Sequence, residues 1–413
     1  MKPVRAFLFL FVLVLLCIGC NMAGTLIDTP KMRESVRQGT AMLCEQGATP
    51  ELTGGFKTSQ MDNFTSVLIL KTAGYTGPET FWQKVFGGFR TDLPKAEGQN
   101  AWEAFCTYAD GSESPTGGLS YSRYWHGYTL PLRILLCFFN VSNLQMLFFG
   151  LELLLTVLLF ILLDRKKMLF LLPGLFCSLF FLMPAATGLC IQYVPVTLVT
   201  FVSCILLLLY RDEMDTGIGL PAVFAGIGIM TNYLDLLTFP LISLGYPIVL
   251  LLAMRIREGA DARKTAWEFL LCCGAWGIAF AGFWLLKWLL TSLVFRFNIL
   301  GGILSQVFLR TSSASNGHTF SRISAFATNL QLLLAKPAYL LLLGLALPAS
   351  LIFSLRGPRK FRPVSLLFLV AAVIPVAYMF LTANHIHDHY YYTYRNLTGS
   401  VFAISAFLAT LRA

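Results

Sequence analysis

The polar stretch from Asn21 to Leu130 carries the side chains best suited to chemistry. In its middle, Asp62 follows a glycine-rich turn and precedes an apolar helix start. Asp62 suits two roles, since Asp caps helix N-termini and a carboxylate also acts as a general base towards an acceptor hydroxyl. Asp28, in the helix-cap context Ile-Asp-Thr-Pro-Lys, is the alternative base. The sequence therefore predicts a site organised around one of these two carboxylates.

The end of the same stretch is a dense aromatic and basic run, Tyr121–Tyr128. Tyr and Trp are common where a chain enters lipid, so an aromatic belt is one interpretation of this run. The other is a substrate cavity, in which aromatic rings stack on a sugar and cationic groups hold phosphate. The dense packing of charge and aromatic groups favours the cavity, to which we assign Arg123, Tyr124, Trp125 and His126.

Histidines and a carboxylate suggest further cavity residues. His385, His387 and His389 alternate around Asp388, and such groups are metal ligands. Alternate residues do not share a helix face, so we expect hydrogen bonding around an outer cavity and no metal, with a divalent ion as the alternative. Asp235 either caps an outer turn or faces this cavity. The expected cavity residues are therefore His385, His389 and Asp235.

The rest of the chain is too apolar for a water-soluble core. The 413 residues are 56% hydrophobic and 13% charged, whereas soluble domains carry about 25% charged residues. A spanning helix needs about 20 apolar residues, and continuous apolar runs favour helices over a barrel. We predict an all-α membrane protein with about ten transmembrane helices and one large first extracytoplasmic loop. The expected spans are Ala6–Cys20, Asn143–Leu163, Met168–Met183, Thr187–Leu209, Ile218–Asn232, Leu236–Met254, Thr265–Leu293, Pro337–Leu355, Pro363–Leu381 and Leu397–Leu411.

Charge predicts the orientation of these spans. The net charge of +10 reflects the positive-inside bias of membrane proteins and not nucleic-acid binding. The net acidic segment Arg211–Asp215 is the weak point of this topology. We expect both termini to be cytoplasmic and the protein to lie in the cell membrane, with predicted inner segments that hold Arg165, Lys166, Lys167, Arg255, Arg257, Arg263, Lys264, Arg356, Arg359, Lys360, Arg362 and Arg412.

The predicted topology divides the chain into a first transmembrane helix (1–20), an extracytoplasmic loop domain (21–130) and a multi-span helical domain (131–413). Cys44 and Cys106 share the loop domain and can pair, although spacing alone does not show a disulfide. The outer segment Val294–Ala335 holds three arginines and no Asp or Glu: Arg296, Arg310 and Arg322. Arginine in outer loops needs compensation, by an anionic ligand, by lipid head groups or by acidic residues of the loop domain.

The predicted chain begins with one N-terminal helix and a large first outer loop with an acidic residue. Many helices with a basic and aromatic outer rim follow. This order resembles the GT-C superfamily of integral-membrane glycosyltransferases. The Asp-Asn-Phe-Thr element at Asp62 and the run Tyr121–Tyr128 also resemble elements of bacterial multi-span membrane families. The resemblance implies a sugar transferred from a polyprenyl-phosphate donor to a glycan or lipid acceptor at the outer face of the bilayer, without a cofactor.

The resemblance also implies roles for residues. It implies that Asp62, with Asp28 in reserve, is the base of an inverting displacement, and that Arg322 and Arg395 bind the donor phosphate together with Arg123. The family often has paired acidic residues soon after the first helix, whereas here Asn63 follows Asp62. Three alternatives stay open: a polymerase or ligase for lipid-linked saccharides, a transporter or flippase supported by Glu152 and Lys287 within spans, and a relative that has lost its chemistry.

Overall fold

The computed structural model describes residues 2–93, 98–107, 117–296, 300–315, 317–355 and 361–411. Of the predicted inner cations, Arg356, Arg359, Lys360 and Arg412 lie outside these residues. The described chain is almost entirely helical, as predicted. Its strands are two short antiparallel pairs, β1 (Phe89–Thr91) with β2 (Gly118–Ser120) and β3 (Ala314–Ser315) with β4 (His318–Thr319).

Six helices in the described part of the chain are long and apolar enough to cross a membrane, which supports a membrane protein. They are α1 (Lys2–Leu26), α7 (Val141–Arg165), α10 (Val194–Gly217), α13 (Ala262–Phe295), α16 (Pro337–Leu355) and the continuous pair η3 (Pro363–Ser365) and α17 (Leu366–Leu381). The four other predicted spans correspond to shorter helices: η2 (Leu169–Leu171) with α8 (Leu172–Leu182), α11 (Leu220–Leu234), α12 (Ile242–Arg257) and α20 (Leu397–Thr410). The count of ten spans stays a prediction.

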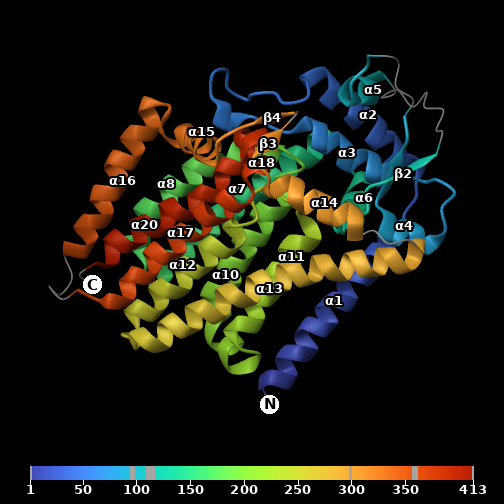
Figure 1. The fold of residues 1–413 in the computed structure, drawn as a ribbon. Helices are drawn as coiled ribbons and strands as arrows, with labels where there is room; N and C mark the ends of the chain where they lie inside the picture. The colour runs from blue at the N-terminus through green and yellow to red at the C-terminus, as the bar shows by residue number, and fades with distance from the viewer. Residues whose placement is uncertain are drawn as a thin grey trace.

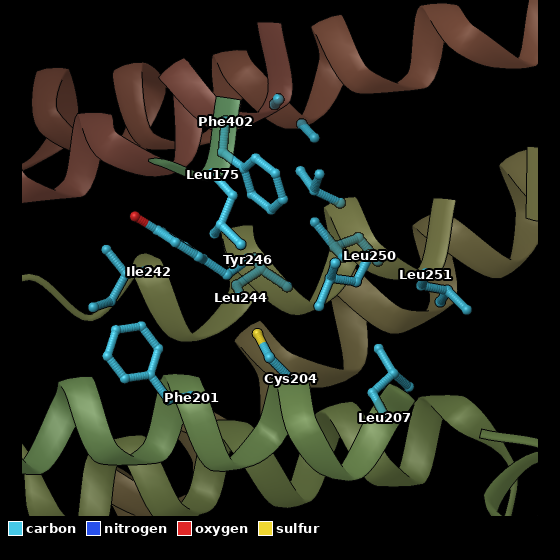
Figure 2. Close-up of a cluster of buried hydrophobic side chains, with 14 of the residues drawn as sticks. Leu175, Phe201, Cys204, Leu207, Ile242, Leu244, Tyr246, Leu250, Leu251 and Phe402 are labelled. Carbon is cyan, nitrogen blue, oxygen red and sulfur yellow. The ribbon is translucent and has the colours of Figure 1, made fainter. Parts of the chain in front are cut away.

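Helix α12 forms the centre of the bundle. Its residues are buried along most of its length because α10, α11, α13, α17 and α20 surround it. Figure 2 shows Tyr246 and Leu250 of α12 facing Phe201 and Cys204 of α10 on one side and Phe402 on the other. A helix that is apolar on every face belongs in such an interior. Helix α12 has only 16 residues and is enclosed by other helices of the protein.

The segment predicted to be extracytoplasmic, called the outer domain below, forms a small helical layer at one end of the bundle, called the outer face (Figure 1). Its helix α2 starts at Thr29, whose hydroxyl accepts a hydrogen bond from the Met32 amide. A disulfide joins Cys44 of α2 to Cys106 of α5, so the pairing left open by spacing is confirmed. The elements are α2 (Pro30–Gln46), η1 (Lys57–Ser59), α3 (Asn63–Gly74), α4 (Phe81–Gly87), α5 (Ala101–Thr107) and α6 (Thr129–Leu136).

Buried polar contacts fasten this domain to the membrane helices. Helix α1 continues to Leu26, beyond the predicted Cys20, and the Asn21 amide on it donates to the Trp125 carbonyl at 2.9 Å. From α13, the ammonium group of Lys287 donates to the Phe86 carbonyl at 2.5 Å. A buried ammonium needs such a partner, so Lys287 contributes to the attachment of the outer domain.

The late outer segments lie beside the same domain. They comprise α14 (Leu300–Thr311), α15 (Arg322–Leu334), α18 (Ala383–Asp388), α19 (Tyr390–Thr393) and η4 (Tyr394–Asn396). A further short helix, α9, spans Pro184–Leu189. The Tyr394 hydroxyl donates to the Thr58 carbonyl at 3.1 Å, and the Tyr391 hydroxyl lies 3.4 Å from the Asp62 carboxylate. Segments more than 300 residues apart therefore meet at the outer face.

Candidate functional site

A cavity of about 180 Å³ lies where the run Tyr121–Tyr128 meets α13, α14 and α17. Helical spacing builds its walls, because residues four apart on a helix lie on one face. Phe280, Trp284 and Trp288 repeat at this interval on α13, and Gln306 and Arg310 do so on α14. The other lining residues are Arg123, Tyr124, Leu237, Val307, Thr311, Tyr378 and Thr382.

Two tryptophans position the start of the cavity. The indole N–H groups of Trp284 and Trp288 both donate to the Arg123 carbonyl, at 2.6 and 3.2 Å. The Tyr124 ring stacks on Trp284 with centroids 5.8 Å apart. Buried Trp side chains usually find such a partner for their N–H. Arg123 and Tyr124, which the sequence analysis assigned to a substrate cavity, both line this cavity.

The charged groups of the cavity are cationic. Arg123 and Arg310 line it, and the described lining residues include no carboxylate. The Arg123 guanidinium lies 5.1 Å from the centre of the Tyr121 ring and donates to Gln306. Arg310 donates to Nδ1 of His385. Guanidinium groups keep their charge in proteins, and each of these two is held by a hydrogen bond to a protein side chain.

The two predicted cavity histidines do not line this cavity, but His385 contacts Arg310. His385 is buried and donates from Nε2 to the Leu237 carbonyl at 2.8 Å, which leaves Nδ1 free to accept from Arg310. Burial and then Arg310 hold the pKa of His385 well below its usual value. The same two causes lower the pKa of His389 to about 4. Neutral imidazoles therefore add no positive charge here.

Asp235 is a carboxylate whose charge acts on residues that line the cavity, although Asp235 is not itself a lining residue. It is buried at the end of α11, where the amide of Thr238 donates to it at 2.9 Å and the Thr238 hydroxyl donates as well. Burial raises its pKa to about 6. The charge of Asp235 acts on Tyr124 and Tyr378, which line the cavity.

Asp62 lies deeper under the outer domain and does not line this cavity. Its carboxylate caps α3, accepting from the Thr65 amide at 2.8 Å and from the Thr65 hydroxyl at 2.9 Å. Burial raises the pKa of Asp62 to about 6, although the hydrogen bonds from Thr65 and Tyr391 oppose this. The capping role considered from the sequence is therefore present.

The reserve carboxylate, Asp28, lies away from the cavity. It is exposed, it forms an ion pair with Arg33 at 2.7 Å, and it borders a different hollow near α1. Asp28 and Asp62 therefore do not converge on the cations of the cavity.

Two of the three expected phosphate ligands also lie elsewhere. Arg395 is fully buried, and its guanidinium donates to the carbonyls of Leu182, Tyr391 and Thr58 at 3.0, 3.2 and 2.8 Å. Arg322 is exposed and donates to the hydroxyl of Ser313 and to the carbonyls of Thr311 and Phe380. Both guanidinium groups hold protein segments together and border no cavity described above.

Trp125 and His126 do not line this cavity. Trp125 stacks on Phe283 with centroids 4.4 Å apart. Nε2 of His126 donates to the Tyr121 carbonyl at 2.7 Å, and Nδ1 accepts from the Tyr128 hydroxyl. Burial lowers the pKa of His126 to about 3. The backbone of His126 has a positive φ of 56°.

Among the described residues, no three His, Cys, Asp or Glu side chains lie close enough together to hold a metal ion. Of the alternating histidines, His387 stacks its ring on Phe320, with the ring centroids 4.0 Å apart. His385 meanwhile contacts Arg310 on the inner side. The residues present therefore do not form the divalent site considered as an alternative.

Sequence reasoning did not single out Arg310, Trp284, Trp288 and Tyr378 as cavity residues. The interval between the two tryptophans was a usable signal, since it places them on one helix face. Arg310 was visible as an outer arginine without a nearby acid, but nothing separated it from Arg296 and Arg322. No protein-family model matches this chain, and neither does any curated protein or solved structure.

Proposed function

We propose that the protein is a membrane glycosyltransferase that binds a polyprenyl-phosphate-linked sugar in the cavity between α13, α14 and α17. The observation that carries this proposal is the pairing of Arg123 and Arg310 with aromatic walls and no lining carboxylate among the described residues. Guanidinium forks suit phosphate oxygens. Tryptophan and tyrosine offer flat apolar faces with a polar edge, which suit a sugar and the first isoprene units.

The proposal includes ten spans, cytoplasmic termini and an outer domain that faces the extracytoplasmic side. The disulfide between Cys44 and Cys106 supports this orientation, because disulfides persist mainly in oxidising compartments. The sugar donor would then lie in the outer leaflet. A glycan or a lipid would be the acceptor.

In the reaction we propose, a carboxylate takes the proton of an acceptor hydroxyl, whose oxygen attacks the anomeric carbon. The bond from this carbon to the phosphate oxygen breaks, and the configuration inverts. Arg123 and Arg310 stabilise the charge that develops on the leaving phosphate, as preorganised donors do. Asp235 is the base that we favour over Asp62, since its charge acts on the cavity tyrosines and its pKa of about 6 leaves it mostly ionised at neutral pH.

A transporter is less well supported. Its sequence support was Glu152 and Lys287, the ionisable groups within spans. Lys287 donates to the Phe86 carbonyl, and Glu152 accepts from the Thr187 hydroxyl at 2.6 Å. Both groups are buried against protein partners, whereas a translocation path needs charged groups that face a water-filled route.

The test uses full-length protein in lipid nanodiscs with a radiolabelled polyprenyl-phosphate sugar and a membrane-derived acceptor mixture. We expect glycosidic product from the wild type, and a loss of at least about 100-fold in Asp235→Asn, the low end for a general base. Arg310→Met should lose a similar factor through the leaving group. Arg37→Ala, on the exposed face of α2, is the matched control and should keep full activity.

Three results would count against the proposal. Full transfer by Asp235→Asn together with loss in Asp62→Asn would move the base to Asp62, and full transfer in both would exclude a carboxylate base at either position. Label that crosses sealed vesicles without a new glycosidic bond would identify a transporter instead.

A further inference from the structure

A second cavity, of about 110 Å³, lies at the outer end of α1 between α1, α3, α4 and α6. It is several times larger than the roughly 30 Å³ that one water occupies in the liquid. Polar side chains dominate its lining, in contrast to the aromatic cavity. They include four threonine hydroxyls and two cations: Thr25, Thr72, Thr76, Thr129, Lys84 and Arg133.

Arg133 forms the fixed, buried base of this cavity. Its guanidinium donates to the carbonyls of Gly24 and Ile27 at the end of α1, and to those of Ala73 and Tyr75 at the end of α3. Helix C-termini leave such carbonyls without partners, and a cation there also complements the helix dipole. The guanidinium group of Arg133 therefore faces backbone dipoles, and these four hydrogen bonds all go to carbonyl groups.

Lys84 adds a second cation that is available to a ligand. It is half-buried at the cavity wall, and the described residues give its ammonium group no hydrogen bond or ion pair. The hydroxyls of Thr76 and Thr129 likewise have no hydrogen-bond partner in the described chain. The carboxylate at the rim, Asp28, is already paired with Arg33. Donors without acceptors therefore converge on one small space.

We infer that this cavity binds a phosphate group carried by a second ligand, with Lys84, Thr76 and Thr129 as donors and Arg133 supplying charge from below. A phosphate offers several acceptor oxygens and a negative charge, which match these unused donors. The site is separate from the aromatic cavity and does not depend on the proposed transferase activity. Trp125 and His126 border it, whereas Arg123 and Tyr124 border the other.

The position of the cavity indicates a lipid as the carrier of this phosphate. The outward face of α1 is apolar and exposed, as expected for contact with acyl chains, at Phe7, Leu8, Phe11 and Leu15. Asn21 and Thr25, near the end of the same helix, border the cavity. Head groups lie just beyond the hydrocarbon core, so a phospholipid beside α1 would bring its phosphate to this level. A soluble phosphate compound has the same chemistry and is the other source.

The experiment measures binding of a fluorescent short-chain phosphatidylglycerol to the full-length protein in neutral detergent. All variants carry Arg310→Met, so that binding in the aromatic cavity does not contribute. We expect Lys84→Ala to weaken binding about tenfold, the effect of one charge-assisted hydrogen bond, and Lys84→Arg to retain it. Lys31→Ala, an exposed lysine of α2, is the matched control and should bind like its parent.

Competition then identifies the source. Displacement of the probe by unlabelled phosphatidylglycerol but not by millimolar inorganic phosphate indicates a lipid head group, and displacement by both indicates a site for phosphate itself. Equal binding by Lys84→Ala and its parent would overturn the inference, and so would an equal loss in Lys31→Ala. Thermal midpoints of the variants check folding, and since the ammonium group of Lys84 has no described partner we expect Lys84→Ala to match its parent.

Discussion

Replacement of Arg395 by methionine distinguishes a structural arginine from a ligand-binding one. Methionine keeps much of the side-chain volume but removes the donors to Leu182, Tyr391 and Thr58. A hydrogen bond from a charged group contributes about 1.5–3 kcal/mol, and the buried carbonyls lose their partner. With partial compensation, since Tyr394 still donates to the Thr58 carbonyl, we expect a loss of about 5 kcal/mol in the free energy of unfolding.

This loss corresponds to a measurable change in thermal midpoint. Unfolding entropies of globular proteins give about 0.9 kcal/mol/K for a chain of 413 residues, so the midpoint should fall by about 6 °C. The assay is fluorescence-detected gel filtration of detergent-solubilised protein after heating. Arg310→Met is the matched variant, because Arg310 is half-buried with His385 as its hydrogen-bond partner. The Arg310→Met protein should keep the thermal midpoint of the wild type and lose donor binding. A stable Arg395→Met protein that no longer binds donor would refute this reasoning and assign the phosphate to Arg395.

Further tests concern the outer domain. Gly88→Ala should destabilise the protein by about 1–3 kcal/mol more than Gly259→Ala. Both glycines have a positive φ (54° and 67°), but only at Gly88 would an added Cβ clash with a neighbour, the imidazole of His126. Equal thermal midpoints of the two variants would contradict this. Reduction of the Cys44–Cys106 disulfide, which closes 62 residues, should cost about 4 kcal/mol by chain entropy; an unchanged midpoint with dithiothreitol would contradict it. The folded pKa of Asp62, about 6, lies above its ordinary 3.8, so its contribution to stability is complete below pH 4 and falls by about 3 kcal/mol as the pH rises to 6. Thermal midpoints of Asp62→Asn should lack this decline, and parallel pH profiles would show that the pKa is not raised.

The helical segments could be predicted from sequence because a continuous apolar run has few alternatives in lipid. Each expected span coincides with a helix, although α12 and α20 are short and enclosed. The end of α1 was placed too early because Asn21 looked like the start of a polar loop. In the structure its amide donates to the Trp125 carbonyl, which lets the helix continue to Leu26.

The candidate site was predictable only in part. The run Tyr121–Tyr128 gave Arg123 and Tyr124, but the residue types did not show that Trp125 and His126 border a different cavity. Arg395 and Arg322 looked equivalent to Arg310 because sequence does not show which backbone carbonyls a guanidinium meets. That information depends on how η4 and α8 pack, which involves residues more than 200 positions apart.

The contacts of α13 with the outer domain determine how a ligand reaches the aromatic cavity. Lys287, Trp284 and Trp288 donate to backbone carbonyls of that domain, and Trp125 donates to the Phe283 carbonyl at 3.0 Å. These contacts hold the roof of the cavity in place, so a long-tailed donor would enter laterally from the bilayer with its tail still among the lipids. The length of the tail would then have little influence on recognition, and discrimination among donors would depend on the head and the first few carbons.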